Sequence, residues 1–178
     1  MVTTNREDWA AKARYLTTQA KDDPIEYIHN QIGYNYRLTN IQAAVGCAQL
    51  ESLFDYIKRK RCIAKNYTNA FLVIPGLTPM SQAPWAESIY WMYTILVNED
   101  EFGMDSRALL NSMQSANIQT RPLWNPLHLN PAHNQSQSYH CDVSTRLNRI
   151  ALSLPCSVGL KERDQNKVIN HICGLKSE

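Results

Sequence analysis

The spacing of apolar residues predicts a chain in which helices alternate with short strands. Between residue 39 or 40 and about residue 60, apolar side chains recur three and four positions apart, as on one face of a helix: Leu50, Leu53, Phe54 and Ile57. The segment 88–97 (SIYWMYTILV) is rich in β-branched and aromatic residues, which favours a buried strand.

Shorter patterns add further elements on either side. Helices are expected at 8–19, 105–116 and 160–173, and strands at 1–5, 118–123 and 151–155. Thr4 and Glu7 have the spacing of a capping box for the first of these helices. In the last two helices the apolar residues share one face: Leu109, Leu110, Met113, Val168, Ile169 and Ile172. This order of elements predicts an α+β fold, with a small sheet backed by helices.

Composition narrows the class of protein. The 178 residues include 44% hydrophobic and 19% charged residues, which is enough for a hydrophobic core. A net charge of +2 does not favour nucleic acid, and no apolar run reaches the length of a membrane span. The N-terminal stretch contains acids and lacks the apolar centre of a secretory signal. The five cysteines include no CxxC pair, which favours reduced thiols in the cytoplasm.

Two runs have alternative interpretations. The basic run 58–61 is better explained by cations that complement a helix C-terminus on a solvated face than by a nucleic-acid signal. Tyr90, Trp91 and Tyr93 belong either to the buried strand or to a platform on which bases stack. No basic groove accompanies these aromatic residues, which favours the strand.

The stretch 33–46, GYNYRLTNIQAAVG, passes from polar and aromatic residues into helix-forming alanines. Asn35 and Arg37 lie two positions apart, just ahead of the predicted helix. They are candidates for binding an anion near the helix N-terminus, where the helix dipole also favours negative charge. The alternative is an ordinary helix start capped by Thr39 or Asn40.

A second stretch, 120–133 (TRPLWNPLHLNPAH), combines three prolines with an arginine, an indole and imidazoles. A stiff loop that presents Arg121, Trp124 and His128 suits a binding surface, although a surface loop with an aromatic anchor has the same pattern. Four residues of zinc-ligand type also occur here: His128, His133, His140 and Cys141. Their spacing matches no zinc finger or ribbon, so we expect no metal site.

Both stretches resemble motifs of one family. GYNYRLTNIQAA is similar to the GYNYRM(T/S)NIQAA segment of the DegT/DnrJ/EryC1/StrS family, the pyridoxal-phosphate-dependent nucleotide-sugar aminotransferases, and TRPLWNPLH resembles its (T/R)RPLWxPLH motif. The resemblance implies the C-terminal small domain of a fold type I aminotransferase: a small antiparallel sheet backed by helices, with a long connecting helix. It divides the chain into a remnant of the large catalytic domain (1–32), a cofactor-proximal segment with the interdomain helix (33–61), and an α+β small domain (62–178).

The resemblance also implies roles for single residues. In such dimers the asparagine that matches Asn35 reaches into the neighbouring subunit and binds the cofactor phosphate, with Arg37 beside it. Residues near the substrate would be Tyr34, Tyr36, Arg121, Trp124 and His128. The family's Schiff-base lysine comes shortly before the segment that matches 1–5, and none of the eight lysines here occupies that place. We therefore expect no catalytic residue in this chain, and no bound pyridoxal phosphate when the chain is alone.

By this resemblance, the intact enzyme would convert a keto nucleotide sugar to an amino sugar for polysaccharide or glycan biosynthesis, with glutamate as amino donor. A function of another class is a free-standing, non-catalytic dimerisation or binding module derived from such an enzyme. Apolar faces that normally pack on a further domain favour a homodimer or higher oligomer. We expect neither nucleic acid nor a membrane as partner.

Overall fold

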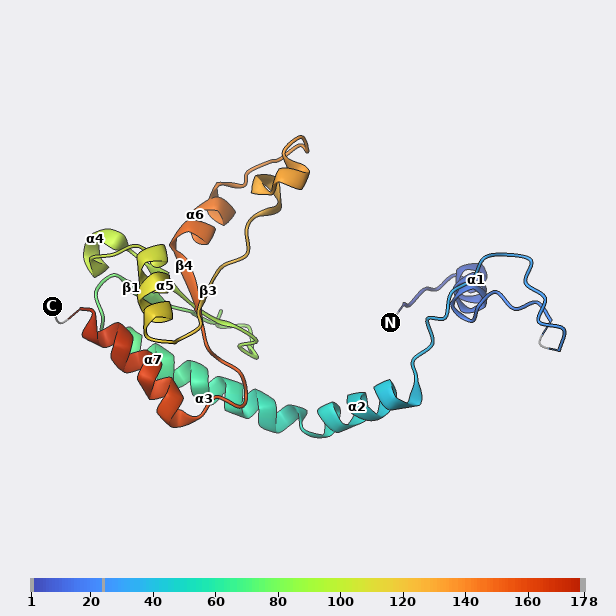
Figure 1. The fold of residues 1–178 in the computed structure, drawn as a ribbon, viewed down its shortest axis with the longest axis horizontal. Coiled ribbons are helices and arrows are strands. Elements are labelled where there is room, and N and C mark those ends of the chain that lie inside the picture. The colour runs from blue at the N-terminus through green and yellow to red at the C-terminus, as the bar shows by residue number, and fades with distance from the viewer. Residues whose placement is uncertain (1, 24, 177–178) are drawn as a thin grey trace. The chain divides into compact units, whose positions relative to one another are not determined.

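The computed structural model describes residues 2–23 and 25–176 (Figure 1). Its internal contacts separate two compact units, Met1–Ser52 and Leu53–Glu178. The expected three-part organisation, with boundaries after residues 32 and 61, stays a prediction. Within the described residues, no helix is long and apolar enough to cross a membrane.

The first unit holds two helices: α1 (Glu7–Thr17) and α2 (Asn40–Glu51). At α2 the expected cap is confirmed. The Thr39 hydroxyl accepts a hydrogen bond from the N–H of Gln42 at 3.3 Å, and the Gln42 side-chain oxygen accepts one from the N–H of Thr39 at 2.9 Å. At α1 the expected capping box is wrong, because the N-cap is Arg6 and makes no side-chain cap. The Thr4 hydroxyl instead accepts from the N–H of Arg6 at 3.1 Å.

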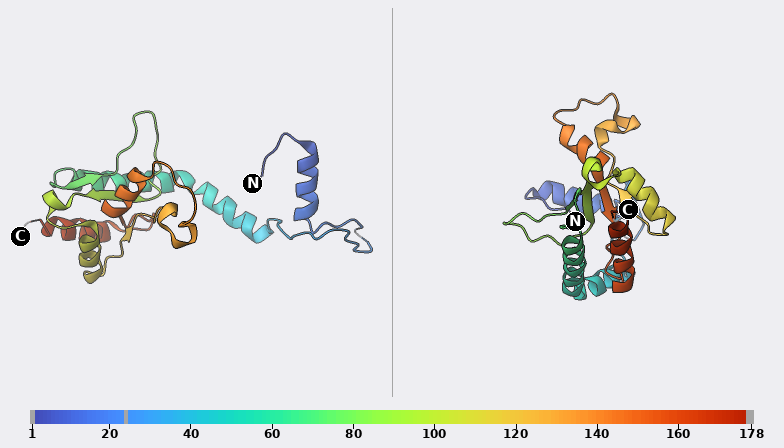
Figure 2. Two further views of the ribbon diagram at one scale, coloured as in Figure 1. Left: turned by 90° about the horizontal axis from the view of Figure 1, so that it is seen from above. Right: turned by 90° about the vertical axis from the view of Figure 1, so that its left-hand side faces the viewer.

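The second unit is a four-stranded antiparallel sheet with helices packed around it (Figures 1 and 2). The strands follow the order β1-β2-β4-β3: β1 (Leu77–Pro79), β2 (Tyr93–Val97), β3 (Arg121–Pro122) and β4 (Ala151–Leu154). The helices are α3 (Leu53–Phe71), α4 (Glu99–Phe102), α5 (Ser106–Ser115), α6 (Asp142–Ile150) and α7 (Glu162–Gly174), with 3-10 turns η1 (Leu127–Leu129) and η2 (Pro131–His133). Helices α3 and α7 lie side by side (Figure 1). The expected α+β fold is confirmed.

The core of the second unit lies between the sheet and its helices. Strand β2 alternates buried and partly exposed residues, so that Tyr93, Ile95 and Val97 are buried. Tyr67 and Phe71 of α3 belong to the same core, and their rings stack with centroids 5.6 Å apart. Of the residues predicted to face inward, four are buried and two are partly buried: Leu109, Met113, Val168 and Ile172, then Leu110 and Ile169.

Pairing between distant segments shortens several predicted strands. The strand expected at 88–97 begins only at Tyr93, and the one expected at 118–123 pairs with β4 only at Arg121 and Pro122. Residues 2–5 form no strand, because no segment of the described chain pairs with them, and Met1 lies outside the described residues. The elements β1, α4 and α6 were not predicted, since their apolar patterns are too short to show a period.

The helix expected from residue 39 or 40 to about residue 60 is interrupted at Ser52. Helix α2 ends at Glu51, and α3 starts at Leu53 and continues to Phe71. Ser52 is the C-cap of α2, in keeping with the preference of serine for helix ends over helix interiors. Three residues of the predicted apolar face are exposed: Leu50, Leu53 and Phe54.

The basic run 58–61 lies inside α3, so its assignment to a solvated helix C-terminus is wrong. The Lys60 ammonium donates to the carbonyls of Trp91 and Cys156 at 2.7 Å and 2.6 Å. The Arg59 guanidinium donates to the carbonyl of Leu160 at 2.6 Å. These cations satisfy carbonyl groups of distant loops, and they fix those loops against α3.

Two buried tyrosines predict a loss of stability at alkaline pH. Burial raises the pKa of Tyr67 and of Tyr93 above the ordinary value of about 10. Above pH 10 the unfolded chain releases these protons while the folded chain keeps them, so the equilibrium moves toward unfolding as pH rises. We expect the free energy of unfolding to fall by up to about 1.4 kcal/mol per pH unit for each tyrosine.

Urea unfolding across the alkaline range measures this decline. The variant Tyr67→Phe removes one of the two phenols, so its free energy of unfolding is expected to fall less steeply with pH. The matched control Tyr139→Phe changes an exposed ring and is expected to leave the slope as in the parent chain. An identical slope in both variants would contradict the assignment.

Candidate functional site

In the first unit, backbone hydrogen bonds to α1 fix the segment that precedes α2. Two of its N–H groups, those of Tyr34 and Tyr36, donate at 2.7 Å and 3.1 Å to the last carbonyls of α1: Leu16 and Thr17. Between these two residues, Asn35 forms an isolated antiparallel bridge with Thr18. Main-chain pairing therefore positions the motif and leaves its polar side chains available.

Gly33 allows the close approach of this segment to the turn after α1. A Cβ atom at residue 33 would lie 2.2 Å from the backbone carbon of Gln19 and 2.3 Å from the backbone nitrogen of Ala20. Only glycine fits at such distances. The facing turn is itself unusual, since Gln19 and Ala20 have φ angles of +72° and +48°. The glycine at the head of the motif is therefore required by packing.

The side chains of the motif divide into two sets. The rings of Tyr34 and Tyr36 stack with centroids 5.2 Å apart and an interplanar angle of 16°. Alternate residues of an extended segment share a face, so Asn35 and Arg37 share the other one. Both polar residues are exposed, and neither side chain has a hydrogen-bond or ionic partner among the described residues. The sequence already predicted that Asn35 and Arg37 would lie near each other, because they are two positions apart.

The groups ahead of α2 form a donor set suited to an anion. The Asn35 amide and the Arg37 guanidinium offer N–H donors, and the helix dipole adds partial positive charge. The N–H groups of Asn40 and Ile41 meet no acceptor in the described chain, whereas that of Gln42 is used by the cap. A phosphate group matches such donors in charge and geometry. Anion binding by this pair stays a prediction.

In the second unit, β3 and the loop after it carry the other three candidates. The Trp124 ring is 64% exposed and stacks on Trp91, with centroids 5.8 Å apart and an interplanar angle of 16°. His128 lies in η1, and its Nε2 atom is 3.0 Å from the hydroxyl oxygen of Thr145. Arg121 is exposed, and its guanidinium has no partner in the described chain. The Trp124 and His128 rings are thus held by contacts with other residues, whereas the Arg121 guanidinium has no such contact in the described chain.

Arg121 lines a cavity of about 500 Å³, a volume within the range of small-molecule sites. Met92 and Cys156 line it too, as do Asp164 and Lys167 of α7. The Lys167 ammonium donates to a backbone carbonyl at 3.0 Å. Two cations and one carboxylate give this cavity a net positive charge, so it suits an anionic group.

The sequence argument favoured a buried strand over a stacking platform for Trp91, and it missed Asn148. Trp91 precedes β2 and is exposed, so its place in a buried strand is wrong. The Asn148 side-chain amide donates to the carbonyls of Leu123 and Trp124 at 2.7 Å and 3.1 Å. No local signal marks Asn148, because an asparagine among polar helix residues resembles a solvated face.

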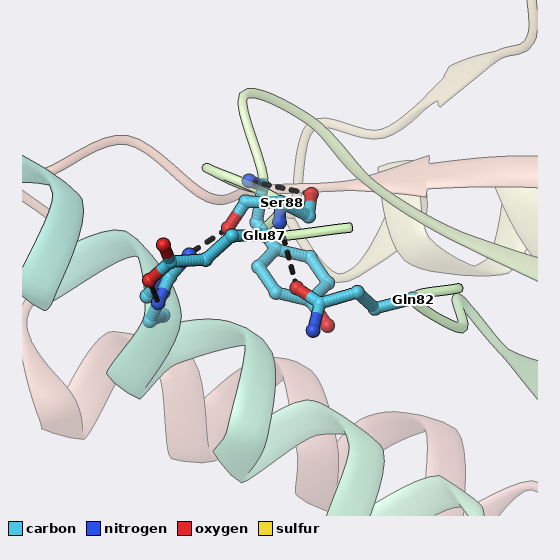
Figure 3. Close-up of polar contacts among 5 residues, drawn as sticks. Gln82, Glu87 and Ser88 are labelled. Atoms are coloured by element: carbon cyan, nitrogen blue, oxygen red, sulfur yellow. Dashed lines mark hydrogen bonds and ion pairs between the residues drawn. The ribbon is translucent and has the colours of Figure 1, made fainter. Parts of the chain in front are cut away.

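Polar contacts also hold the loop that leads into β2 (Figure 3). The Gln82 side-chain oxygen accepts from the N–H of Ser88 at 2.7 Å, and the Ser88 hydroxyl accepts from the N–H of Tyr90 at 3.1 Å. From α3, Arg61 donates to the Ser88 carbonyl at 3.1 Å and forms an ion pair with Glu87. The loop is therefore tied to α3 and to itself.

The residues present fit part of a pyridoxal phosphate site. The donors ahead of α2 suit its phosphate group. An imine requires a lysine amine that is free to react. Three of the eight lysines, Lys12, Lys60 and Lys167, donate hydrogen bonds to oxygen atoms of other residues. Within the described ranges, no three His, Cys, Asp or Glu side chains are grouped as metal ligands.

The chain matches one family model and several curated proteins. A model of the DegT/DnrJ/EryC1/StrS aminotransferase family matches residues 1–173. EpsN of Bacillus subtilis (strain 168), whose name assigns it provisionally to the pyridoxal phosphate-dependent aminotransferases, is 34% identical over 98% of this chain and 45% of its own. GDP-perosamine synthase of Caulobacter vibrioides is 30% identical over 95% of this chain and 46% of its own.

Solved structures have the same fold. A DegT DnrJ EryC1 StrS aminotransferase from Brucella abortus, 27% identical, matches with a TM-score of 0.77 over 98% of this chain and 45% of its own. Helicobacter pylori PseC, an aminotransferase involved in the biosynthesis of pseudoaminic acid, is 21% identical and has a TM-score of 0.81 over 98% of this chain and 47% of its own. That second likeness shows the fold alone. The chain spans about half the length of the curated relatives it matches.

Proposed function

Because the chain belongs to the DegT/DnrJ/EryC1/StrS aminotransferase family, we propose that it is the C-terminal portion of an enzyme that converts a keto nucleotide sugar to an amino sugar, with glutamate as amino donor. The observation that carries the proposal is the exposed pair Asn35 and Arg37 ahead of α2, whose side chains have no partner among the described residues. The GDP-perosamine synthases among the relatives support a nucleotide-sugar substrate. The amino sugar would enter polysaccharide or glycan biosynthesis.

Enzymes of this family use pyridoxal phosphate, which when bound supplies the electron sink for moving an amino group. In the proposal, the Asn35 amide and the Arg37 guanidinium bind phosphate oxygen atoms, assisted by the N-terminus of α2. Arg121, Trp124 and His128 bind the substrate. The lysine that holds the cofactor belongs to the half of the relatives' length that this chain does not span.

The proposed site is shared between two subunits. Ile41 and Val45 of α2 are exposed apolar residues, and water contact with them is unfavourable. A homodimer that buries this helix removes that contact, and it brings Asn35 of one protomer to the cofactor phosphate of its partner. The chain alone is then incomplete as a catalyst.

A chimaera tests the proposal. The portion of EpsN that this chain does not match is joined to residues 1–178, and cofactor binding and the spectral response to glutamate are measured. We expect the chimaera to hold pyridoxal phosphate. The variant Asn35→Ala is expected to weaken cofactor binding about tenfold or more, because a hydrogen bond to a charged group is lost.

The matched control is Asn111→Ala, at an exposed position in α5 whose side chain has no partner among the described residues. This control is expected to bind the cofactor as the parent chimaera does. A chimaera that is folded and dimeric by light scattering, yet holds no cofactor, would contradict the proposed enzyme. That same result would favour a non-catalytic dimerisation module.

A further inference from the structure

A second cavity of the second unit is lined by side chains of both charges. Its volume is about 640 Å³, within the range of small-molecule sites, and it shares no lining residue with the cavity that Arg121 lines. It lies where β2 ends and β4 begins, beside the starts of α4 and α5 and the second half of α6. Three acidic and three basic residues line it: Glu99, Asp100, Asp105, Arg107, Arg146 and Arg149.

Two of these six side chains are used within the fold. The Asp105 carboxylate caps α5 and accepts from two N–H groups of its first turn at 2.8 Å and 2.7 Å. The Arg107 guanidinium donates to the Asn148 carbonyl at 3.0 Å. Ser106 is buried, and its hydroxyl donates to the Arg149 carbonyl at 2.6 Å. These bonds join α5 to the end of α6, so the walls of the cavity are fixed before a ligand binds, which reduces the entropy lost on binding.

The other four charged side chains have no hydrogen-bond or ionic partner among the described residues: Glu99, Asp100, Arg146 and Arg149. A single exposed charge needs no partner, because water solvates it. Here, however, charges of both signs border one cavity, and none of these carboxylates forms an ion pair with either guanidinium group. The cavity therefore presents two separated carboxylates and two separated guanidinium groups to its contents.

This balance of charge selects the kind of ligand. Three carboxylates disfavour an inorganic anion, and three guanidinium groups disfavour a simple cation. A molecule with both signs can use both sets, because guanidinium groups donate charge-assisted hydrogen bonds to a carboxylate and carboxylates accept them from an ammonium group. An α-amino acid has these two groups on one carbon atom. Leu96 and Ile150 also line the cavity, which suits an aliphatic side chain.

We propose that this cavity binds a free aliphatic α-amino acid. The carboxylate of the amino acid meets the guanidinium groups of Arg146 and Arg149. Its ammonium group meets the carboxylates of Glu99 and Asp100. No residue of the stretch 33–46 or of the loop 120–133 lines the cavity, so this site does not depend on the proposed function.

Calorimetric titration of the 178-residue chain with L-leucine tests the proposal. Two analogues with one charge each are titrated alongside: isocaproate lacks the ammonium group, and isopentylamine lacks the carboxylate. L-Leucine is expected to bind about tenfold more tightly than either analogue, because each analogue loses its contacts with one pair of charged side chains. This comparison needs no variant, so it is independent of any effect of a substitution on folding.

Two variants locate the site. Arg149→Gln and Glu99→Gln are each expected to weaken L-leucine binding about twofold to fivefold, the effect of one exposed ion pair. Arg149→Gln is also expected to narrow the difference in affinity between L-leucine and isopentylamine. Glu99→Gln is expected to narrow the difference between L-leucine and isocaproate.

The matched controls are Arg163→Gln and Glu162→Gln, the same changes at exposed positions of α7 that do not line the cavity. Both are expected to bind L-leucine as the parent chain does. Absence of L-leucine binding, or equal affinity for L-leucine and both analogues, would overturn the proposal. Parent-like affinity in both Arg149→Gln and Glu99→Gln would also overturn it, because L-leucine would then bind elsewhere on the chain.

Discussion

Gly33→Ala is expected to unfold the turn that holds Asn35, at a cost of about 3 kcal/mol. The added methyl group would lie 2.2 Å and 2.3 Å from backbone atoms of Gln19 and Ala20. A flexible side chain could move aside, but these are main-chain atoms in a turn fixed by hydrogen bonds to Tyr15 and Tyr34. Hydrogen exchange at the N–H groups of this turn measures the effect, because local opening exposes them.

The matched control is Gly46→Ala in α2. A Cβ atom at residue 46 meets nothing within 4 Å, and alanine is the better helix former by about 1 kcal/mol. Gly46→Ala is thus expected to slow hydrogen exchange in α2 slightly. Gly33→Ala, the same chemical change, is expected to speed exchange in the turn that faces residue 33. Unchanged exchange at Gln19 and Ala20 in Gly33→Ala would contradict the close approach on which the position of Asn35 depends.

Tyr67→Ala is expected to destabilise the second unit by about 3 to 5 kcal/mol. The ring is fully buried, stacks with Phe71 and lies 5.1 Å from the ring of Tyr93. Its hydroxyl donates to the carbonyl of Pro155 at 2.8 Å. Removing the ring leaves a cavity where α3 packs against β2, and it leaves that carbonyl without its donor. Equilibrium unfolding in urea measures the loss.

Two variants separate the contributions at this position. Tyr67→Phe keeps the ring and is expected to cost about 1 to 2 kcal/mol, the effect of one buried acceptor without its donor. Tyr139→Ala, at an exposed ring, is expected to stay within about 0.5 kcal/mol of the parent chain. A Tyr67→Ala chain as stable as Tyr139→Ala would show that α3 is not packed on the sheet through this ring.

The two groups of candidate residues, one in each unit, differ in how far the sequence predicts them. Asn35 and Arg37 are local, because they lie two positions apart just ahead of a helix, and the structure confirms the helix and its Thr39 cap. Arg121, Trp124 and His128 were recognised as a loop motif. Their partners Trp91 and Thr145 come from other segments, so local pattern contains no information about these contacts.

The basic run in α3 illustrates the same limit. From sequence, four cations in a row are typical of a solvated face. In the structure, Arg59, Lys60 and Arg61 bond to carbonyl groups of distant loops. Whether a cation meets water or a carbonyl depends on which loop packs beside it.

The sequence by itself determined the α+β class, the cap of α2, the inward faces of α5 and α7, and membership in a family through the stretch that begins at Gly33. Each depends on interactions within a few residues or on a motif that is read directly. Only the tertiary structure decided where β2 begins, why residue 33 must be glycine, and that Trp91 faces water beside Trp124. Those features depend on contacts between segments far apart in the chain. A local sequence pattern does not show which of these contacts form, because their free energy depends on both segments.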